Sequence, residues 1–263
     1  MTLARALRTH WPEYAIEAAG LGLFMVSAIG FSVLLQHPAS PVRAALPDPV
    51  LRRVLMGLAM GATGMSLVYS PWGKRSGAHF NPALTLTFFR LGKVEPADAL
   101  FYALAQFAGA VAGVSVASIA LGMLPADASV RFAVTTPGAF GTAGAFAAEV
   151  ALSFGLMLVV LVVSNRPHIA RATGICCGVL VAVYIAVEAP ISGMSMNPAR
   201  TLGSAAVAQV FTSIWIYFAA PVAGMLLAAE AYVRVASARA VHCAKLHHQN
   251  EQRCIFRCGW AMR

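Results

Sequence analysis

The chain has 263 residues, of which 59% are apolar and 11% are charged, and its formal net charge is +9. That apolar fraction exceeds the ~45–50% of a typical soluble domain, and so few charges could not cover a soluble protein of this size. The composition therefore argues against a soluble enzyme or binding domain and favours a protein embedded in lipid.

Six stretches are apolar over about 17 residues or more, which is long enough for an α-helix to cross ~30 Å of hydrocarbon. None of them alternates with a period of two, so we expect helices rather than barrel strands. The predicted fold class is an all-α membrane protein. In chain order, the predicted spans are residues 14–35, 51–70, 97–124, 142–164, 173–189 and 210–235.

The basic residues are distributed unequally between the two sides that six crossings create. Only five of the 19 Lys and Arg residues fall on the side without the termini, namely Arg43, Arg52, Arg53, Arg131 and Arg200. This asymmetry predicts that both termini are cytoplasmic. We further expect a multi-pass protein of the plasma (cell inner) membrane. No basic stripe is interleaved with aromatic residues, so we expect no nucleic-acid partner.

Two segments of the chain match each other closely. Residues 76–86 and 192–202 are identical at seven of eleven positions, at an offset of 116 residues. Glu17 and Glu149 are each a lone acid early in an apolar span. We therefore predict a cytoplasmic N-terminus at 1–12 and two repeats of three spans at 13–124 and 125–235, and an odd number of spans inverts the second repeat relative to the first.

Each repeat contains an Asn-Pro-Ala triplet at a place where a helix should begin. Asn is a favoured N-cap and Pro a favoured first helical residue. The apolar run that follows lasts about ten residues, half a membrane span, and predicts re-entrant half-helices at 81–91 and 197–207. We expect the approaches, 76–80 and 192–196, to be extended chain, which is tolerated at membrane depth only inside protein or beside a water-filled cavity.

With both triplets in place, the sequence resembles the aquaporin (major intrinsic protein) family over nearly its whole length up to about residue 235. The resemblance implies six helices and two half-helices around a pore in each subunit, usually in a homotetramer. It further implies that Glu17 and Glu149 accept hydrogen bonds from loop backbone N–H groups. The implied pore residues are Asn81, Pro82 and Ala83 in the first triplet, Asn197, Pro198 and Ala199 in the second, and Met60 or Gly61, Ile185, Met194 and Arg200 in the outer selectivity filter.

The filter positions give conflicting indications about the substrate. Water-specific members of the family typically carry an aromatic residue and a His at the first two filter positions, and this sequence has neither. The filter is therefore expected to be more apolar than in a strict water channel. The positions that favour the water branch instead are Thr201, Ala205 and Tyr217–Phe218.

We expect passive conduction of water as the main function, with exclusion of ions and protons. The alternative is a broader pore for glycerol, ammonia, hydrogen peroxide or other small neutral solutes. A proton-coupled transporter that uses Glu17, Glu149 and Glu188 is a different class, and it would require a proton gradient. No nucleophile–base set or metal-ligand cluster occurs within the spans, so we expect neither an enzyme nor a cofactor.

Three further groups of polar residues have simpler interpretations. Glu188 could pair with Arg200, although a Glu at a wet helix end is the simpler expectation, and His79 is interpreted as a hydrogen-bonded loop histidine rather than a pH gate. The segment 236–263 is expected to be an unstructured basic cytoplasmic tail without a metal site, because its spacing fits no standard zinc pattern. The Cys and His residues of this tail are His242, Cys243, His247, His248, Cys254 and Cys258.

Overall fold

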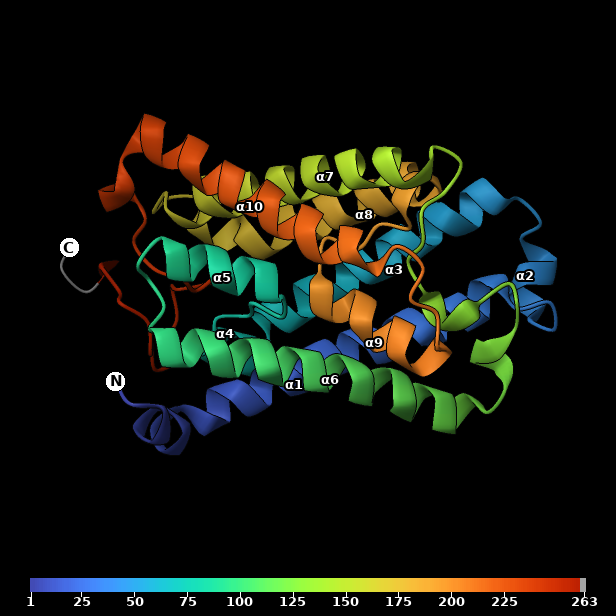
Figure 1. Cartoon of the computed structure of the whole chain (residues 1–263), viewed down its shortest axis with the longest axis horizontal. Coiled ribbons are helices and arrows are strands. Elements are labelled where there is room, and N and C mark those ends of the chain that lie inside the picture. Colours follow the sequence, from blue (N-terminus) through green and yellow to red (C-terminus); the bar gives the residue numbers. More distant parts are fainter. Residues whose placement is uncertain (261–263) are drawn as a thin grey trace.

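The computed structural model describes residues 1–260, and every regular element in that range is a helix. Six long helices lie side by side (Figure 1). This arrangement confirms the predicted all-α class. The long helices are α1 (Leu3–Gln36), α3 (Pro49–Tyr69), α6 (Pro96–Leu121), α7 (Gly141–Ser164), α8 (Thr173–Ser192) and α10 (Ile214–Ala236), and the shorter α-helices are α2 (Pro41–Ala45), α4 (Pro71–Ser76), α5 (Pro82–Arg90) and α9 (Pro198–Ala208).

Five of the long helices are long and apolar enough to cross a membrane by length and composition alone. The sixth, α3, has 21 residues and packs along α8, but it carries Arg52 and Arg53 near its start. Large apolar side chains such as Ile119 and Val187 are exposed on the outside of the bundle. A surface of that kind is suited to contact with lipid rather than water.

The helices pair in a pattern that repeats between the two halves of the chain. Helix α1 packs against α6, and α7 packs in the same way against α10. The close approach of α1 and α6 depends on Gly109, because a Cβ at this position would collide with the backbone of Ala18. Small residues allow helix backbones to approach in this way within membranes.

The short helices α5 and α9 begin near the middle of the bundle and point toward opposite ends of it (Figure 1). Their observed bounds, Pro82–Arg90 and Pro198–Ala208, lie within one residue of the predicted half-helices. Each helix starts at the Pro of an Asn-Pro-Ala triplet, with the Asn as its N-cap. The backbone therefore turns back at membrane depth inside protein, where its polar groups can find partners.

The structure corrects the expectation of an unstructured tail. The N-terminus and the tail up to residue 260 lie at one end of the bundle, which we call the terminal end, and the tail covers this end (Figure 1). Within the tail, Val241, Ala244, Leu246 and Phe256 are buried in the hydrophobic core. The last three residues of the predicted tail, 261–263, lie outside the described residues.

Candidate pore and its asparagine pair

Asn81 and Asn197 bring the tips of the two half-helices together. The Asn81 side-chain oxygen accepts a hydrogen bond from the N–H of Ala83 at 2.9 Å, and that of Asn197 accepts from the N–H of Ala199 at 3.0 Å. These are N-cap bonds to otherwise unpaired amides of the first helical turn. The triplets predicted from the sequence therefore form two capped helix starts.

The two asparagines also tie the repeats to each other reciprocally. Asn81 Nδ2 donates to the carbonyl of Met196 at 2.8 Å, and Asn197 Nδ2 donates to the carbonyl of Phe80 at 2.7 Å. Each carbonyl belongs to the residue that precedes the other asparagine. An amide NH2 has two hydrogens, so this cross-link leaves each asparagine a second N–H that can donate elsewhere.

The approach to each asparagine is not regular extended chain. Ser76 and Ser192 still belong to the preceding helices, and Gly77 and Gly193 follow with φ of 99° and 82°. Ala78 and Phe80 also have positive φ, as do Met194 and Met196 in the second repeat. Three left-handed residues within four positions bend the backbone tightly, and only glycine adopts such angles without steric cost. The predicted extended approach is therefore replaced by a shorter, tightly bent segment in each repeat.

Glu17 holds the first approach in place. One carboxylate oxygen accepts from Ser76 Oγ at 2.7 Å and from the N–H of His79 at 3.1 Å, and the other accepts from the N–H of Phe80 at 2.6 Å and from Gln106 Nε2 at 2.8 Å. A carboxylate buried inside a membrane protein is costly unless it is satisfied in this way. The loop N–H contacts are those that the family resemblance implies for this residue.

Glu149 makes the equivalent contacts in the second repeat. It accepts from Ser192 Oγ, from the N–H of Ser195 and from the N–H of Met196, each at 2.7 Å. A tyrosine supports each approach as well: the hydroxyl of Tyr102 donates to the Ser76 carbonyl and that of Tyr217 to the Ser192 carbonyl, both at 2.6 Å. Sequence reasoning missed these tyrosines in this role, although their offset of 115 residues is close to the 116 residues that separate the two matching segments.

A single cavity of about 310 Å³ joins the predicted pore residues. Asn81, Asn197 and Arg200 all line it, and Arg200 Nη1 donates to the carbonyl of Ala133 at 2.8 Å. The remaining predicted filter residues that line it are Met60, Gly61, Ile185 and Met194. The two asparagines and the filter side chains therefore face a common space, whereas Pro82, Ala83, Pro198 and Ala199 do not line it.

Two other predictions have different outcomes. Glu188 is buried rather than at a wet helix end, and it does not line the cavity. The hydrogen bonding predicted for His79 is confirmed, because both ring nitrogens are paired, Nδ1 with Thr85 Oγ1 at 3.0 Å and Nε2 with the Ala244 carbonyl at 2.9 Å. Ala244 belongs to the tail, which the sequence did not place here.

Comparisons with known proteins agree with this architecture. A relative described as a putative aquaporin of type NIP4-1 from Arabidopsis thaliana is 40% identical over 167 residues, which make up 63% of this chain and 57% of the relative. Aquaporin NIP1-3 from Oryza sativa subsp. japonica is 40% identical over 176 residues, 66% of this chain and 59% of the relative. The matched regions thus span less than two thirds of these relatives.

The fold also matches a solved structure. The aquaglyceroporin from Plasmodium falciparum superposes with a TM-score of 0.72 over 88% of this chain and 99% of that one, at 22% sequence identity. The family model described as major intrinsic protein matches residues 7–232. The chain is therefore a multi-pass membrane protein of the major intrinsic protein family, the family of the aquaporin channels, and it is not an enzyme.

Proposed function

We propose that this channel conducts water passively down an osmotic gradient and excludes ions and protons. The observation that carries the proposal is the reciprocal pair of Asn81 and Asn197 on the wall of a cavity that Arg200 also lines. A passive pore needs fixed donors and acceptors that replace part of the hydrogen bonding of bulk water. The second N–H of each asparagine and the carbonyls of the two approaches supply these groups.

The apolar wall between these groups serves rapid flow. Side chains such as Leu21, Phe24 and Val181 line the cavity but offer no hydrogen bonds. Water that is held at a few polar points and nowhere else binds weakly enough to leave again, which conduction requires. The same arrangement gives a dehydrated ion few ligands.

Cations meet a positive barrier, as described for aquaporin-type pores in general. Each half-helix N-terminus behaves as roughly +0.5 elementary charge. Two such ends ~5 Å from a cation oppose it by ~3 kcal/mol at an effective dielectric near 20, and the charge of Arg200 at a similar distance adds about as much again. Each contribution corresponds to about two decades of discrimination, on top of the cost of removing the ion's hydration shell.

A broader selectivity for small uncharged solutes such as glycerol is the second candidate function. Met60, Ile185 and Met194 share the cavity wall with Arg200, and the predicted filter offers no aromatic ring or imidazole. An apolar filter of this kind favours the carbon backbone of a polyol beside the guanidinium. The solved aquaglyceroporin with the same fold agrees with this candidate.

Proton-coupled transport has less support. Glu17 and Glu149 are committed to hydrogen bonds that hold the approaches. A proton carrier must change its protonation during each cycle, which would repeatedly release these loops. Glu188 does not line the cavity.

The proposal includes both cytoplasmic termini, residence in the plasma membrane and assembly as a homotetramer in which every subunit has its own pore. The excess of Lys and Arg at the terminal end supports the orientation. The tetramer is proposed from family membership and from the exposed apolar faces of the bundle. Cross-linking of the purified chain in detergent would test it, and a purely monomeric pattern would contradict it.

Stopped-flow light scattering on reconstituted vesicles tests the substrate. We expect rapid shrinkage under a sucrose gradient, which a water pore produces. Under a glycerol gradient, shrinkage followed by fast reswelling would establish the broader pore, whereas shrinkage without fast reswelling would restrict the channel to water. The same measurement is made on Cys258→Ser, a variant of the tail. The proposal is overturned if both this variant and the wild-type chain shrink no faster than protein-free vesicles.

A further inference from the structure

The tail forms a cover over the terminal end of the cavity. Leu246 lines the cavity, and its N–H donates to the carbonyl of Gly77 at 3.1 Å. The Phe256 ring stacks on the His79 ring, with centroids 5.2 Å apart and planes 8° from parallel. The tail therefore contacts the approach that leads directly to Asn81.

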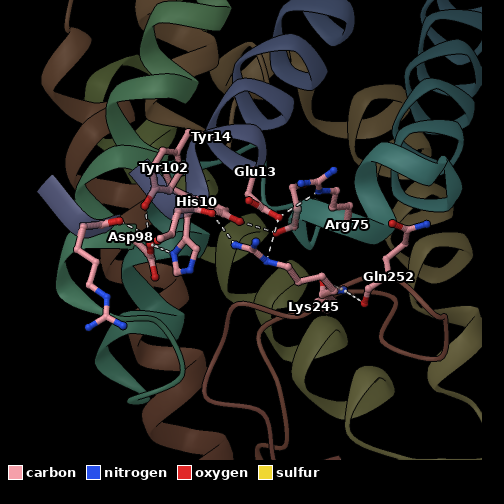
Figure 2. Close-up of polar contacts among 12 residues, drawn as sticks. His10, Glu13, Tyr14, Arg75, Asp98, Tyr102, Lys245 and Gln252 are labelled. Carbon is pink, nitrogen blue, oxygen red and sulfur yellow. Dashed lines mark hydrogen bonds and ion pairs between the residues drawn. The ribbon is translucent and has the colours of Figure 1, made fainter. Parts of the chain in front are cut away.

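Ion pairs fasten the cover to the bundle. Glu13 in α1 is fully buried and pairs with Arg75 in α4 at 3.1 Å and with Arg253 of the tail at 3.6 Å. In Figure 2, Glu13 lies beside Arg75 and above Lys245 and Gln252 of the tail. Further along the tail, Arg257 pairs with Glu95 at 2.6 Å.

These contacts attach the tail to the bundle, but they do not explain what fixes the conformation of the tail itself. Beyond the single turn of 3-10 helix at Ala238–Ala240, residues 241–259 form no helix or strand. A segment of about 20 residues cannot build a core of its own, and such segments usually need disulfides or a metal ion to hold one shape. The tail contains a group of side chains that meets this need.

Four potential metal ligands converge in the tail. One ligand atom from each of Cys243, His248, Cys254 and Cys258 lies within 4.8 Å of the other three. Cys243 Sγ is 3.6 Å from Cys254 Sγ, and Cys258 Sγ is 3.0 Å from His248 Nε2. In a tetrahedral zinc site with Zn–S of ~2.3 Å, neighbouring sulfurs are ~3.8 Å apart. The four ligand atoms therefore already have nearly the spacing of a Cys3His zinc site.

The backbone around the cysteines is arranged to support thiolates. The backbone N–H of Lys245 lies near Cys243 Sγ, and that of Phe256 lies near Cys254 Sγ. The N–H of Trp260 donates to Cys258 Sγ at 3.4 Å. Each sulfur thus has beside it the backbone N–H of the residue two positions later. Such second-shell donors orient metal-bound sulfurs and offset their charge.

The charges of the site also balance. Three thiolates, a neutral imidazole and a divalent ion together carry one negative charge. Lys245 is buried near the three cysteines, and its Nζ donates to the carbonyls of Gln252 at 3.0 Å and Arg253 at 2.7 Å. One buried ammonium therefore compensates the one net charge and also joins the two halves of the tail.

We propose that Cys243, His248, Cys254 and Cys258 bind one zinc ion, and that this ion holds residues 241–260 over the terminal mouth of the pore. Thiolate and imidazole ligands in tetrahedral positions suit Zn²⁺, and four protein ligands leave no open position, as in structural zinc sites. A disulfide between Cys243 and Cys254 would use only two of the four groups. The zinc site itself does not depend on which solute the pore conducts.

Metal analysis of the full-length chain, purified in detergent without added metal, tests the site. We expect about one zinc per chain, and loss of most of it in Cys258→Ser and His248→Asn. The matched controls are His247→Asn in the same tail and Cys176→Ser in α8, which lie outside the group of four and should keep the zinc. To exclude loss through misfolding, the chelated wild-type chain is titrated with Co²⁺. It should show the visible bands of tetrahedral cobalt–thiolate coordination, and zinc should abolish them.

Limited trypsin digestion tests the cover without any measurement of transport. Arg253 and Arg257 offer cleavage sites, and we expect chelation to speed cleavage there by about tenfold or more, since proteolysis follows the population of the open form. Added zinc should restore protection in the wild-type chain but not in Cys258→Ser. The proposal is overturned by zinc-free protein without cobalt bands, by a Cys243–Cys254 disulfide in the freshly purified chain, or by cleavage that is insensitive to chelation.

Discussion

Replacing Glu17 by Gln removes the charge that holds the first approach, with almost no change in the volume of the side chain. Glu17 accepts four hydrogen bonds, two at each carboxylate oxygen. A Gln side chain has only one oxygen. The two donors that bonded to the other oxygen of Glu17 must therefore face an NH2 group. Gln106 can compensate, because its Oε1 is buried without a partner and the amide can rotate to accept.

The loss can be estimated from the donors that remain. If Gln106 rotates to accept from the new NH2, the N–H of Phe80 loses its acceptor and the Gln106 amide gives up its bond to Thr85. A buried unpaired N–H costs about 1–3 kcal/mol, and the surviving bonds lose the assistance of a charge. Taking about 2 kcal/mol as the central value, opening of the loop should become easier by about 30-fold.

Hydrogen–deuterium exchange on the chain in detergent measures this opening directly. Amides of residues 77–81 should exchange about 30-fold faster in Glu17→Gln, and residues 193–197 should respond in the same way to Glu149→Gln. The control is Glu230→Gln, which removes a solvent-exposed ion pair with Arg90 and should leave both loops unchanged. Exchange within threefold of the wild type in both loop variants would refute the reasoning.

Three other substitutions have distinct expected outcomes. Arg200→Val should raise cation leakage of vesicles by about two decades while water flow persists, and unchanged leakage would show that Arg200 has no electrostatic role. Asn197→Ala removes the cap of α9 and the bond to Phe80, which should lower the free energy of unfolding by about 2 kcal/mol. The melting temperature in detergent should therefore fall, and an unchanged melting temperature would contradict this. Gly109→Ala should lower the free energy of unfolding by about 1–3 kcal/mol, because the new Cβ collides with Ala18. Gly30→Ala is the control, since Gly30 has open space around it and the change should leave the stability unaltered. Equal melting temperatures of the two variants would contradict the packing.

The sequence predicts the membrane helices and half-helices well because their signals are local. Hydropathy depends on side chains that face lipid or the core of the bundle, and the Asn-Pro pair fixes a helix start from two adjacent residues. Helix α1 is the exception, since it begins at Leu3 rather than at residue 14. Its polar first turns are stabilised by tertiary contacts such as His10 Nδ1 with Asp98 at 2.8 Å (Figure 2). A hydropathy pattern carries no information about such contacts.

In the candidate site, too, the sequence predicts features that depend on neighbouring residues and misses those that depend on distant ones. The duplicated triplets locate Asn81 and Asn197, but the reciprocal bonds between the repeats depend on chain separations of 115 and 117 residues. The tail depends even more on contacts between residues that are distant in the chain. Its Cys and His spacing matches no standard zinc pattern, and its position depends on distant partners such as Gly77 and Glu13. Only the folded structure brings those groups together.

Osmotic water permeability per chain, measured by stopped-flow in vesicles with and without a proton gradient, tests most directly whether this fold is a passive pore. The measurement includes the wild-type chain, Cys258→Ser with a released tail, and a double variant, Asn81→Leu with Asn197→Leu. We predict flow well above that of protein-free vesicles in at least one of the first two proteins, independent of the proton gradient and largely abolished in the double variant. Flow that requires a proton gradient, or that persists unchanged without both asparagines, would contradict the account.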